Sequence, residues 1–210
     1  AARGADLMLF ARRAGPLEEA ATRVRQAAVS DEQRVEFRSL DVTLESAVGA
    51  VLEEAVARFG APDVLVNCAG RARPGYFEDI DAERLAETLD VNFHGIWNVV
   101  RSLLPHMKAS GGIIVNTASL AGVIGVFGFT DYSAAKFAVV GFSEALRAEV
   151  KRHGIRVFVL CPPDTDTPGF EEENREKPPE TRAISGAASL LTSEAVARAL
   201  LAGIEGRRML

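Results

Sequence analysis

Tyr132 and Lys136 are the two residues of this chain whose types and spacing are best suited to chemistry. On a helix, side chains four residues apart project from the same face, so the phenol and the ammonium would lie side by side. A nearby cation favours the phenolate, and the pair therefore predicts a tyrosine whose pKa is lowered from its usual value of ~10. Such a tyrosine can exchange a proton with a substrate. A surface Tyr–Lys pair without function would have the same spacing.

Ser119 lies thirteen residues before Tyr132 and directly follows the apolar run of residues 112–118. Continuous apolar runs of this kind are typical of buried parallel strands. The Ser119 hydroxyl would then emerge at the C-terminal edge of a strand, where open α/β sheets bind their ligands. A serine at a strand end, followed by the tyrosine and the lysine, predicts a proton-transfer site more specifically than the Tyr–Lys spacing alone.

Apolar segments alternate with helical patterns along the chain, and they predict the elements that must position these side chains. Strands are expected at residues 5–11, 35–42, 63–68, 112–118 and 156–161. Helices are expected from Pro16 onward, at 44–59, at 82–108 with a break near Pro105, at 132–153 and at 194–205. Residues 162–193 predict a long functional loop with short helices. The alternation predicts an α/β fold, a Rossmann-like doubly wound parallel sheet with helices on both faces.

Composition bounds the remaining possibilities. The 210 residues are 48% hydrophobic, which is enough for a single domain with one core over residues 1–210. The formal net charge of −5 without a long basic run argues against a nucleic-acid partner. No apolar stretch reaches the ~18 residues of a membrane span and no signal peptide is visible, so a cytoplasmic protein is expected. Cys68 and Cys161 stand apart without a CxxC pair or histidine cluster, which predicts reduced thiols and no metal site.

Several motifs in order along nearly the whole chain resemble the classical short-chain dehydrogenase/reductases, single-domain enzymes that use a nicotinamide cofactor. Residues 67–70 (NCAG) resemble the family's NNAG segment, and residues 162–167 (PPDTDT) take the place of its PGxVxT segment, with Pro163 where glycine is usual. The resemblance implies a catalytic tetrad of Asn92, Ser119, Tyr132 and Lys136. In such a tetrad the tyrosine would protonate a substrate carbonyl, and the serine would stabilise the alkoxide that develops there. The resemblance also implies that the lysine lowers the tyrosine pKa and holds the nicotinamide ribose. The asparagine would position a water.

The same resemblance implies a set of cofactor contacts. It consists of Arg12, Arg13, Asp41, Val42, Asn67, Ala69, Gly70, Tyr132, Lys136, Pro162, Thr165 and Thr167. An acid at the end of the first visible strand would indicate NAD, whereas an arginine there accommodates the 2′-phosphate of NADP. The chain has Phe10-Ala11-Arg12-Arg13 at this point, which predicts NADP(H). A solvated arginine that only caps the loop is an alternative, stronger for Arg13 than for Arg12.

One part of the family pattern is missing. The phosphate-binding TGxxxGxG turn and its preceding strand are absent, and the family's last strand is not visible. The series Gly122, Gly125, Gly128 has the wrong spacing and position to replace that turn. We therefore expect a domain truncated at both ends. The family resemblance also implies a homo-oligomer, a dimer or tetramer, formed through the helices at 82–108 and 132–153.

Residues 161–170 (CPPDTDTPGF), with the acids of 171–173 and the run 177–182, resemble one group of the family, the 3-ketodihydrosphingosine reductases. The likeness implies NADPH-dependent reduction of the C3 ketone of 3-ketosphinganine, a lipid-like ketone of sphingolipid synthesis, with peripheral membrane contact. Acids 171–173 are candidates to attract the substrate ammonium, or else form a solvated loop. Apolar residues are candidates for an alkyl-chain path, or else belong to the core: Val123, Ile124, Val126, Phe127, Phe129 and Phe170. Another ketone or alcohol as substrate, and a non-catalytic dinucleotide-binding protein, remain the alternatives.

Overall fold

The strands and helices alternate as the sequence predicts. A computed structural model describes residues 1–185 and 190–206. The strands are β1 Leu7–Ala11, β2 Val35–Ser39, β3 Val64–Asn67, β4 Gly112–Thr117, β5 Ile155–Leu160 and the short β6 Thr165–Asp166 and β7 Leu191–Thr192. The α-helices are α1 Ala14–Gln26, α2 Glu45–Phe59, α3 Ala82–Leu89, α4 Gly95–Ser110, α5 Thr130–Val150, α6 Pro168–Glu176, α7 Pro179–Ser185 and α8 Ser193–Ile204. Single turns lie at η1 Phe77–Asp79, η3 Leu120–Gly122 and η4 Lys151–His153, with a π-helical turn, η2, at Asp90–His94.

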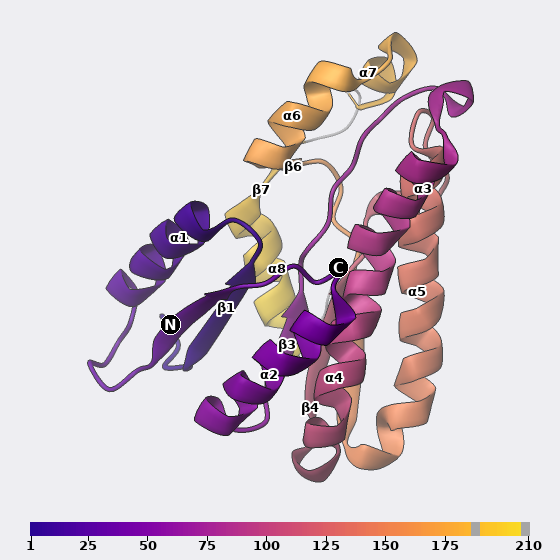
Figure 1. Cartoon of the computed structure of the whole chain (residues 1–210). Helices are drawn as coiled ribbons and strands as arrows, with labels where there is room; N and C mark the ends of the chain where they lie inside the picture. Colours follow the sequence, from indigo (N-terminus) through magenta and orange to yellow (C-terminus); the bar gives the residue numbers. More distant parts are fainter. Residues whose placement is uncertain (186–189, 207–210) are drawn as a thin grey trace.

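All strand pairs of the described residues are parallel, which confirms the α/β prediction. β3, β4 and β5 form one sheet in that order, β1 pairs with β2, and β6 pairs with β7. β1 and β3 make no ladder with each other, so the main strands form two blocks (Figure 1). Parallel strands all end at the same edge, so β3, β4 and β5 deliver residues 68, 118 and 161 to one side of the sheet.

The core lies between β4, β5 and the three helices α2, α4 and α5. Its central side chains are fully buried: Val48, Ile96, Met107, Ile114 and Val139. The rings of Trp97 and Phe142 lie 5.4 Å apart, so α4 and α5 run side by side, as Figure 1 shows. This packing fixes the direction of α5, which carries Tyr132 and Lys136 in its first two turns.

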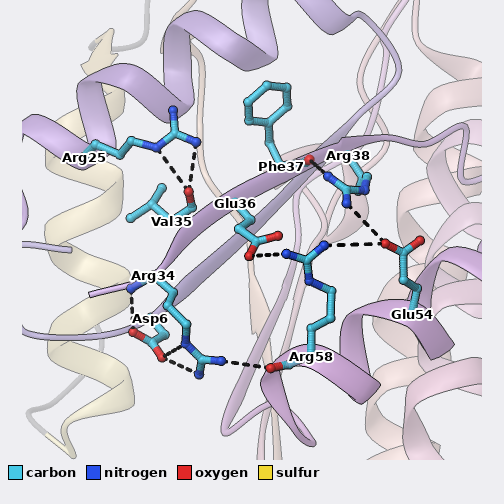
Figure 2. Close-up of polar contacts among 9 residues, drawn as sticks. All are labelled: Asp6, Arg25, Arg34, Val35, Glu36, Phe37, Arg38, Glu54 and Arg58. Carbon is cyan, nitrogen blue, oxygen red and sulfur yellow. Dashed lines mark hydrogen bonds and ion pairs between the residues drawn. The ribbon is translucent and has the colours of Figure 1, made fainter. Parts of the chain in front are cut away.

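A charged network ties β1 and β2 to the end of α2 (Figure 2). The Arg34 guanidinium donates to Asp6 Oδ2 at 2.8 and 2.5 Å and to the backbone carbonyl of Arg58 at 2.8 Å. Arg58 in turn donates to Glu36 at 2.7 Å. The Arg34 backbone N–H and guanidinium hold the pKa of Asp6 below its usual range. Water screens exposed ion pairs, so the network aligns these elements more than it stabilises them.

The break in the long helix lies at η2, and the expectation of a break near Pro105 is wrong. α4 continues through Pro105 to Ser110. Proline leaves the carbonyl four residues earlier, that of Arg101, without its helical partner. Both Pro105 and Arg101 are exposed, so water can satisfy that carbonyl and the helix persists. The π-helical turn instead sits at Asn92, a position typical of functional sites.

The expected loop 162–193 contains two short strands, α6 and α7, and its residues 186–189 lie outside the described residues. α6 and α7 lie at one end of the molecule (Figure 1). Thr181 of α7 is fully buried and donates to the carbonyl of Phe127 at 3.0 Å. Tyr76 donates to Glu180 at 3.1 Å. α7 is thus fastened to the segments that precede α5.

Gly128→Ala is expected to lower the free energy of unfolding by about 2–4 kcal/mol. Gly128 has φ +79°, which is strained for alanine, and an added Cβ would overlap the Thr181 hydroxyl. Gly125→Ala is the matched control, because nothing lies within 4 Å of its added Cβ. Chemical denaturation of the two variants measures the difference. Equal unfolding midpoints would contradict this packing of α7.

Candidate active site

Ser119 and Tyr132 meet at the end of β4. Ser119 is the N-cap of η3, and its hydroxyl accepts from the backbone N–H of Ala121 at 3.2 Å. The Ser119 side chain lies near enough to the Tyr132 phenol to lower the pKa of that phenol. Tyr132 lies in the first turn of α5, and its ring packs 5.8 Å from that of Phe129. The predicted strand-end serine and the helical tyrosine are therefore brought together.

Lys136 and Asn92 converge beside Gly70. The Lys136 ammonium is buried, lies 5.5 Å from the centre of the Tyr132 ring and donates to the Thr117 carbonyl at 2.9 Å. A Cβ on Gly70 would lie 2.9 Å from Asn92 Oδ1 and 3.4 Å from Lys136 Nζ. Glycine is required there, because any side chain would crowd both groups. All four members of the expected tetrad thus gather at one edge of the sheet.

The electrostatic expectation for Tyr132 is wrong for the chain by itself. Burial raises the pKa of Tyr132 to about 12, the Ser119 hydrogen bond opposes that rise, and the charges of Glu173 and Asp164 add to it. Burial also lowers the pKa of Lys136 to about 8. Desolvation disfavours the charged forms of both residues and is the largest cause of each shift. A neutral Tyr132 retains its proton and is suited to donate it.

Arg12 stands where a cofactor phosphate is expected. Its side chain is 67% exposed and lies 3.9 Å from Asp41. Asp41 also accepts from the backbone N–H and hydroxyl of Thr43, which hold the pKa of its carboxyl below the usual range, with a smaller contribution from Arg12. Arg13 is exposed at the start of α1. The Arg12 guanidinium is therefore accessible to an anion.

The Val42 carbonyl accepts from Asn98 at 3.0 Å, so α4 holds the segment after β2. The Asn67 side chain points into the fold and donates to Asn116 at 2.9 Å, which leaves only its backbone for a ligand. Ala69 and Gly70 are exposed.

The segment after β5 is joined to the serine turn. The Pro162 carbonyl accepts from the backbone N–H of Leu120 at 3.0 Å, next to Ser119. Thr165 donates to the Pro163 carbonyl at 2.9 Å, and Thr167 caps α6 by accepting from Phe170 N–H at 3.1 Å. Pro162 therefore lies beside the tetrad, while the hydroxyls of Thr165 and Thr167 organise the turn into α6.

The acids of α6 differ from one another. Glu171 and Glu172 are exposed, whereas the Glu173 side chain is 16% exposed and lies 2.9 Å from Lys177 Nζ. The Lys177 side chain is 1% exposed, and Asp164 lies 3.7 Å from the same ammonium. The two carboxylates thus meet one buried ammonium in an Asp164–Glu173–Lys177 trio, and sequence reasoning named Glu173 but missed its pairing with Lys177. The four-residue spacing of Glu173 and Lys177 is the signal that could have indicated it.

The candidate alkyl-chain residues also divide. Val123, Ile124 and Phe127 are 55%, 54% and 47% exposed, and Val126 and Phe170 are partly buried. Phe129 is 6% exposed and belongs to the core. Phe170 lies on α6, whereas the other four residues lie on the segment between Ser119 and Tyr132.

Two further searches cover only residues 1–185 and 190–206. Within them, no three His, Cys, Asp or Glu side chains gather in a way that would hold a metal ion. Likewise, no helix of that part is both long and apolar enough to cross a bilayer.

Comparisons with known proteins agree with this arrangement. The chain is 41% identical over 93% of its length to the 3-dehydrosphinganine reductase of Danio rerio, of which it covers 59%, and 40% identical over 94% of its length to the 3-ketodihydrosphingosine reductase of Bos taurus, of which it covers 60%. It thus spans about 60% of the length of these relatives. An alcohol dehydrogenase from Thermococcus sibiricus, solved with 5-hydroxy-NADP, superimposes with a TM-score of 0.81 at 25% identity, over 97% of this chain and 81% of that one. The model of the short chain dehydrogenase family matches residues 1–178, and the chain belongs to that family.

Proposed function

We propose that this protein is an NADPH-dependent reductase that converts the C3 ketone of 3-ketosphinganine to the alcohol of sphinganine. The observation that carries the proposal is the convergence of Ser119, Tyr132, Lys136 and Asn92 at the C-terminal edge of β4. The two vertebrate reductases named above support the choice of substrate.

Each residue has a physical role in this reaction. When bound, NADPH supplies the hydride. Tyr132 donates its proton to the carbonyl oxygen, and Ser119 donates a hydrogen bond to the alkoxide that develops there. Lys136 holds the cofactor ribose, and its charge favours the phenolate that Tyr132 leaves behind. After the reduction Lys136 passes a proton back to that phenolate, and a water held by Asn92 replaces the proton on Lys136.

The residues fit the cofactor at two points. Gly70 has no side chain to block a ligand from the exposed edge beside Lys136 Nζ, and the Arg12 guanidinium is exposed. We propose the contacts Arg12, Arg13, Asp41, Val42, Asn67, Ala69, Gly70, Tyr132, Lys136, Pro162, Thr165 and Thr167, with the backbone serving at Asn67.

The decisive experiment is NADPH oxidation by the purified natural protein with 3-ketosphinganine and, in parallel, with short acyl ketones. Preferred turnover of the sphingoid ketone is the expected result. Turnover of only the short ketones would reject 3-ketosphinganine as the substrate and favour a reductase of the same family that acts on another ketone. No turnover of any ketone or alcohol would favour a dinucleotide-binding protein without catalysis.

Arg12→Ala is expected to raise the KM for NADPH about 10- to 100-fold, because it removes charge-assisted hydrogen bonds to the 2′-phosphate. The KM for NADH should stay unchanged, because NADH lacks that phosphate. Initial rates with both cofactors measure the effect. A loss shared equally by NADH would contradict the assignment, and a larger loss in Arg13→Ala would move the phosphate to Arg13.

Glu173→Gln is expected to raise the KM for 3-ketosphinganine about 5- to 10-fold. The Asp164–Glu173–Lys177 trio has one negative charge in excess beside Tyr132, which suits an ammonium next to the substrate carbonyl. A ketone whose amine is acylated carries no such charge, and its KM should not change. Glu172→Gln, on the exposed face of α6, is the matched control. Equal changes for both ketones would contradict amine recognition at Glu173.

Exposed apolar side chains support two proposals about partners. Trp97 and Phe137, on α4 and α5, are 43% and 45% exposed and support self-association into a homo-oligomer. Val123, Ile124 and Phe127 support peripheral contact of a cytoplasmic protein with lipid. Analytical ultracentrifugation and liposome flotation test the two.

A further inference from the structure

A buried polar cluster contacts the backbone of the catalytic tyrosine. It consists of Arg84 and Thr88 on α3 and Asp131 at the start of α5, which we call the Arg84–Thr88–Asp131 cluster. Asp131 and Thr88 are 3% and 8% exposed, and the Arg84 side chain is 15% exposed. None of the three belongs to the expected catalytic or cofactor set.

Asp131 binds the backbone in the first turn of α5. Its Oδ1 accepts from the backbone N–H of Tyr132 at 2.9 Å. Its Oδ2 accepts from the Thr88 hydroxyl at 2.9 Å and lies 3.4 Å from Arg84 Nε. The two carboxylate oxygens therefore connect the backbone of the catalytic residue to two points on α3.

Thr88 joins Tyr132 to Asn92. Its hydroxyl binds Asp131, and its carbonyl accepts from Asn92 Nδ2 at 2.9 Å. Asn92 also donates to the Arg71 carbonyl at 2.8 Å and accepts from the Arg71 N–H at 3.1 Å. Thr88 thus hydrogen-bonds both Asn92 and Asp131, the residue that holds the Tyr132 backbone. Asn92 and Tyr132 lie forty residues apart in the chain.

Arg84 connects the cluster to the segment of residues 73–75. Its Nη2 donates to the Arg73 carbonyl at 2.5 Å, and a Cβ on Gly75 would lie 3.0 Å from its Nη1. The Gly75 N–H donates to the Gly128 carbonyl at 2.8 Å, just before α5. The segment 71–75, which contacts Asn92, and the entry to α5 are therefore held against the same guanidinium.

Stability alone does not account for this cluster. A buried ion pair is often no more stabilising than apolar residues of the same volume, because both charges lose their hydration. Two hydrogen bonds of the cluster end on catalytic residues, at the Tyr132 backbone N–H and the Asn92 side-chain amide. Such bonds restrict geometry, and a shift of about 1 Å at a reacting group can cost about 10²-fold in rate.

We propose that Arg84, Thr88 and Asp131 are positioning residues that hold the Tyr132 phenol in register with Asn92 and Lys136. The proposal rests on the proposed reductase function for its kinetic consequence. The cluster acts by fixing the first turn of α5 and the backbone of Arg71, and it touches neither substrate nor cofactor.

Thr88→Val is the first test, because it removes one hydroxyl and keeps the shape and the carbonyl that binds Asn92. The kcat for ketone reduction should fall about 10- to 100-fold, while the KM for NADPH stays within about twofold. The solvent deuterium isotope effect on kcat should increase, since donation of the Tyr132 proton becomes slower.

Asp131→Asn retains an acceptor for the Tyr132 N–H and should keep more activity than Asp131→Ala. The double variant Thr88→Val with Asp131→Asn should lose no more than the worse single variant.

Glu144→Gln is the control, because Glu144 is an exposed acid on the same helix. Hydrogen exchange of the cofactor-free protein gives a second readout, independent of the reaction. In Thr88→Val, the amides of Arg71 and Tyr132 should exchange faster, and those of β4 should not. If Asp131→Ala fails to fold, Thr88→Val still decides.

Wild-type kcat and wild-type exchange in Thr88→Val would overturn the proposal. So would a parallel loss of kcat and NADPH affinity with additive effects in the double variant. If the natural protein reduces a different ketone, the same comparison is made with that ketone, so that failure of the substrate assignment stays separate. Altered exchange with no turnover in the wild type would refute the reductase function while supporting the structural connection.

Discussion

Tyr132→Phe is expected to lower kcat for ketone reduction by about 10²- to 10⁴-fold, the range that general acid catalysis contributes. The variant removes only the hydroxyl whose pKa the nearby Ser119 lowers. The phenyl ring keeps its contact with Phe129, so the fold and NADPH binding should persist. Because burial raises the pKa of Tyr132 to about 12, the wild-type phenol stays protonated at neutral pH and can act as the donor. Stopped-flow or steady-state NADPH oxidation measures the loss.

The chain provides a matched control in its other tyrosine. Tyr76 hydrogen-bonds Glu180 at the surface, and Tyr76→Phe should leave kcat within about twofold. Thermal unfolding of both variants separates a chemical loss from a folding loss. Wild-type turnover in Tyr132→Phe would refute Tyr132 as the proton donor.

Local sequence patterns predicted the elements of the fold because each depends on neighbouring residues. The apolar run 112–118 became β4, and the period of residues 44–59 became α2. Sequence patterns do not predict which residues of an element face solvent and which face the core. Pro105 is tolerated within α4 because its side of the helix is hydrated, and Phe129 is buried although its sequence neighbours Phe127 and Gly125 lie at the surface.

The candidate site divides in the same way. Ser119, Tyr132 and Lys136 were predictable because a strand end and one helix turn set their positions. The Arg84–Thr88–Asp131 cluster was not, because Thr88 and Asp131 are 43 residues apart and only the packing of α3 on α5 brings them together. The pKa of Tyr132 was predicted in the wrong direction for a related reason. Spacing indicates a neighbouring cation, but only the structure gives the burial that outweighs it.

Lys136→Met is expected to stabilise the cofactor-free protein while it nearly abolishes reduction. The ammonium is 3% exposed, and burial lowers its pKa from 10.5 to about 8, which corresponds to roughly 3 kcal/mol of unfavourable charge burial at neutral pH. Methionine avoids that cost and loses the hydrogen bond to the Thr117 carbonyl, worth about 1 kcal/mol. The free energy of unfolding should therefore rise by about 1–3 kcal/mol at pH 7, while kcat falls about 10²- to 10⁴-fold.

The stability difference between Lys136→Met and the wild type should depend on pH. The unfolded chain keeps the Lys136 proton up to a pH of about 10.5, whereas the folded protein releases it at a pH of about 8. Between these values the unfolded state binds more protons, so the contribution of Lys136 to stability increases as the pH rises through this window and is lost as the pH falls through it. The advantage of Lys136→Met over the wild type should accordingly be full below pH 8 and shrink towards pH 10.5. Lys108→Met, at an exposed lysine of α4, should show no such trend. Denaturation measured across this range tests the prediction. A variant that is less stable than the wild type at pH 7 would contradict a net cost of burying the charged Lys136.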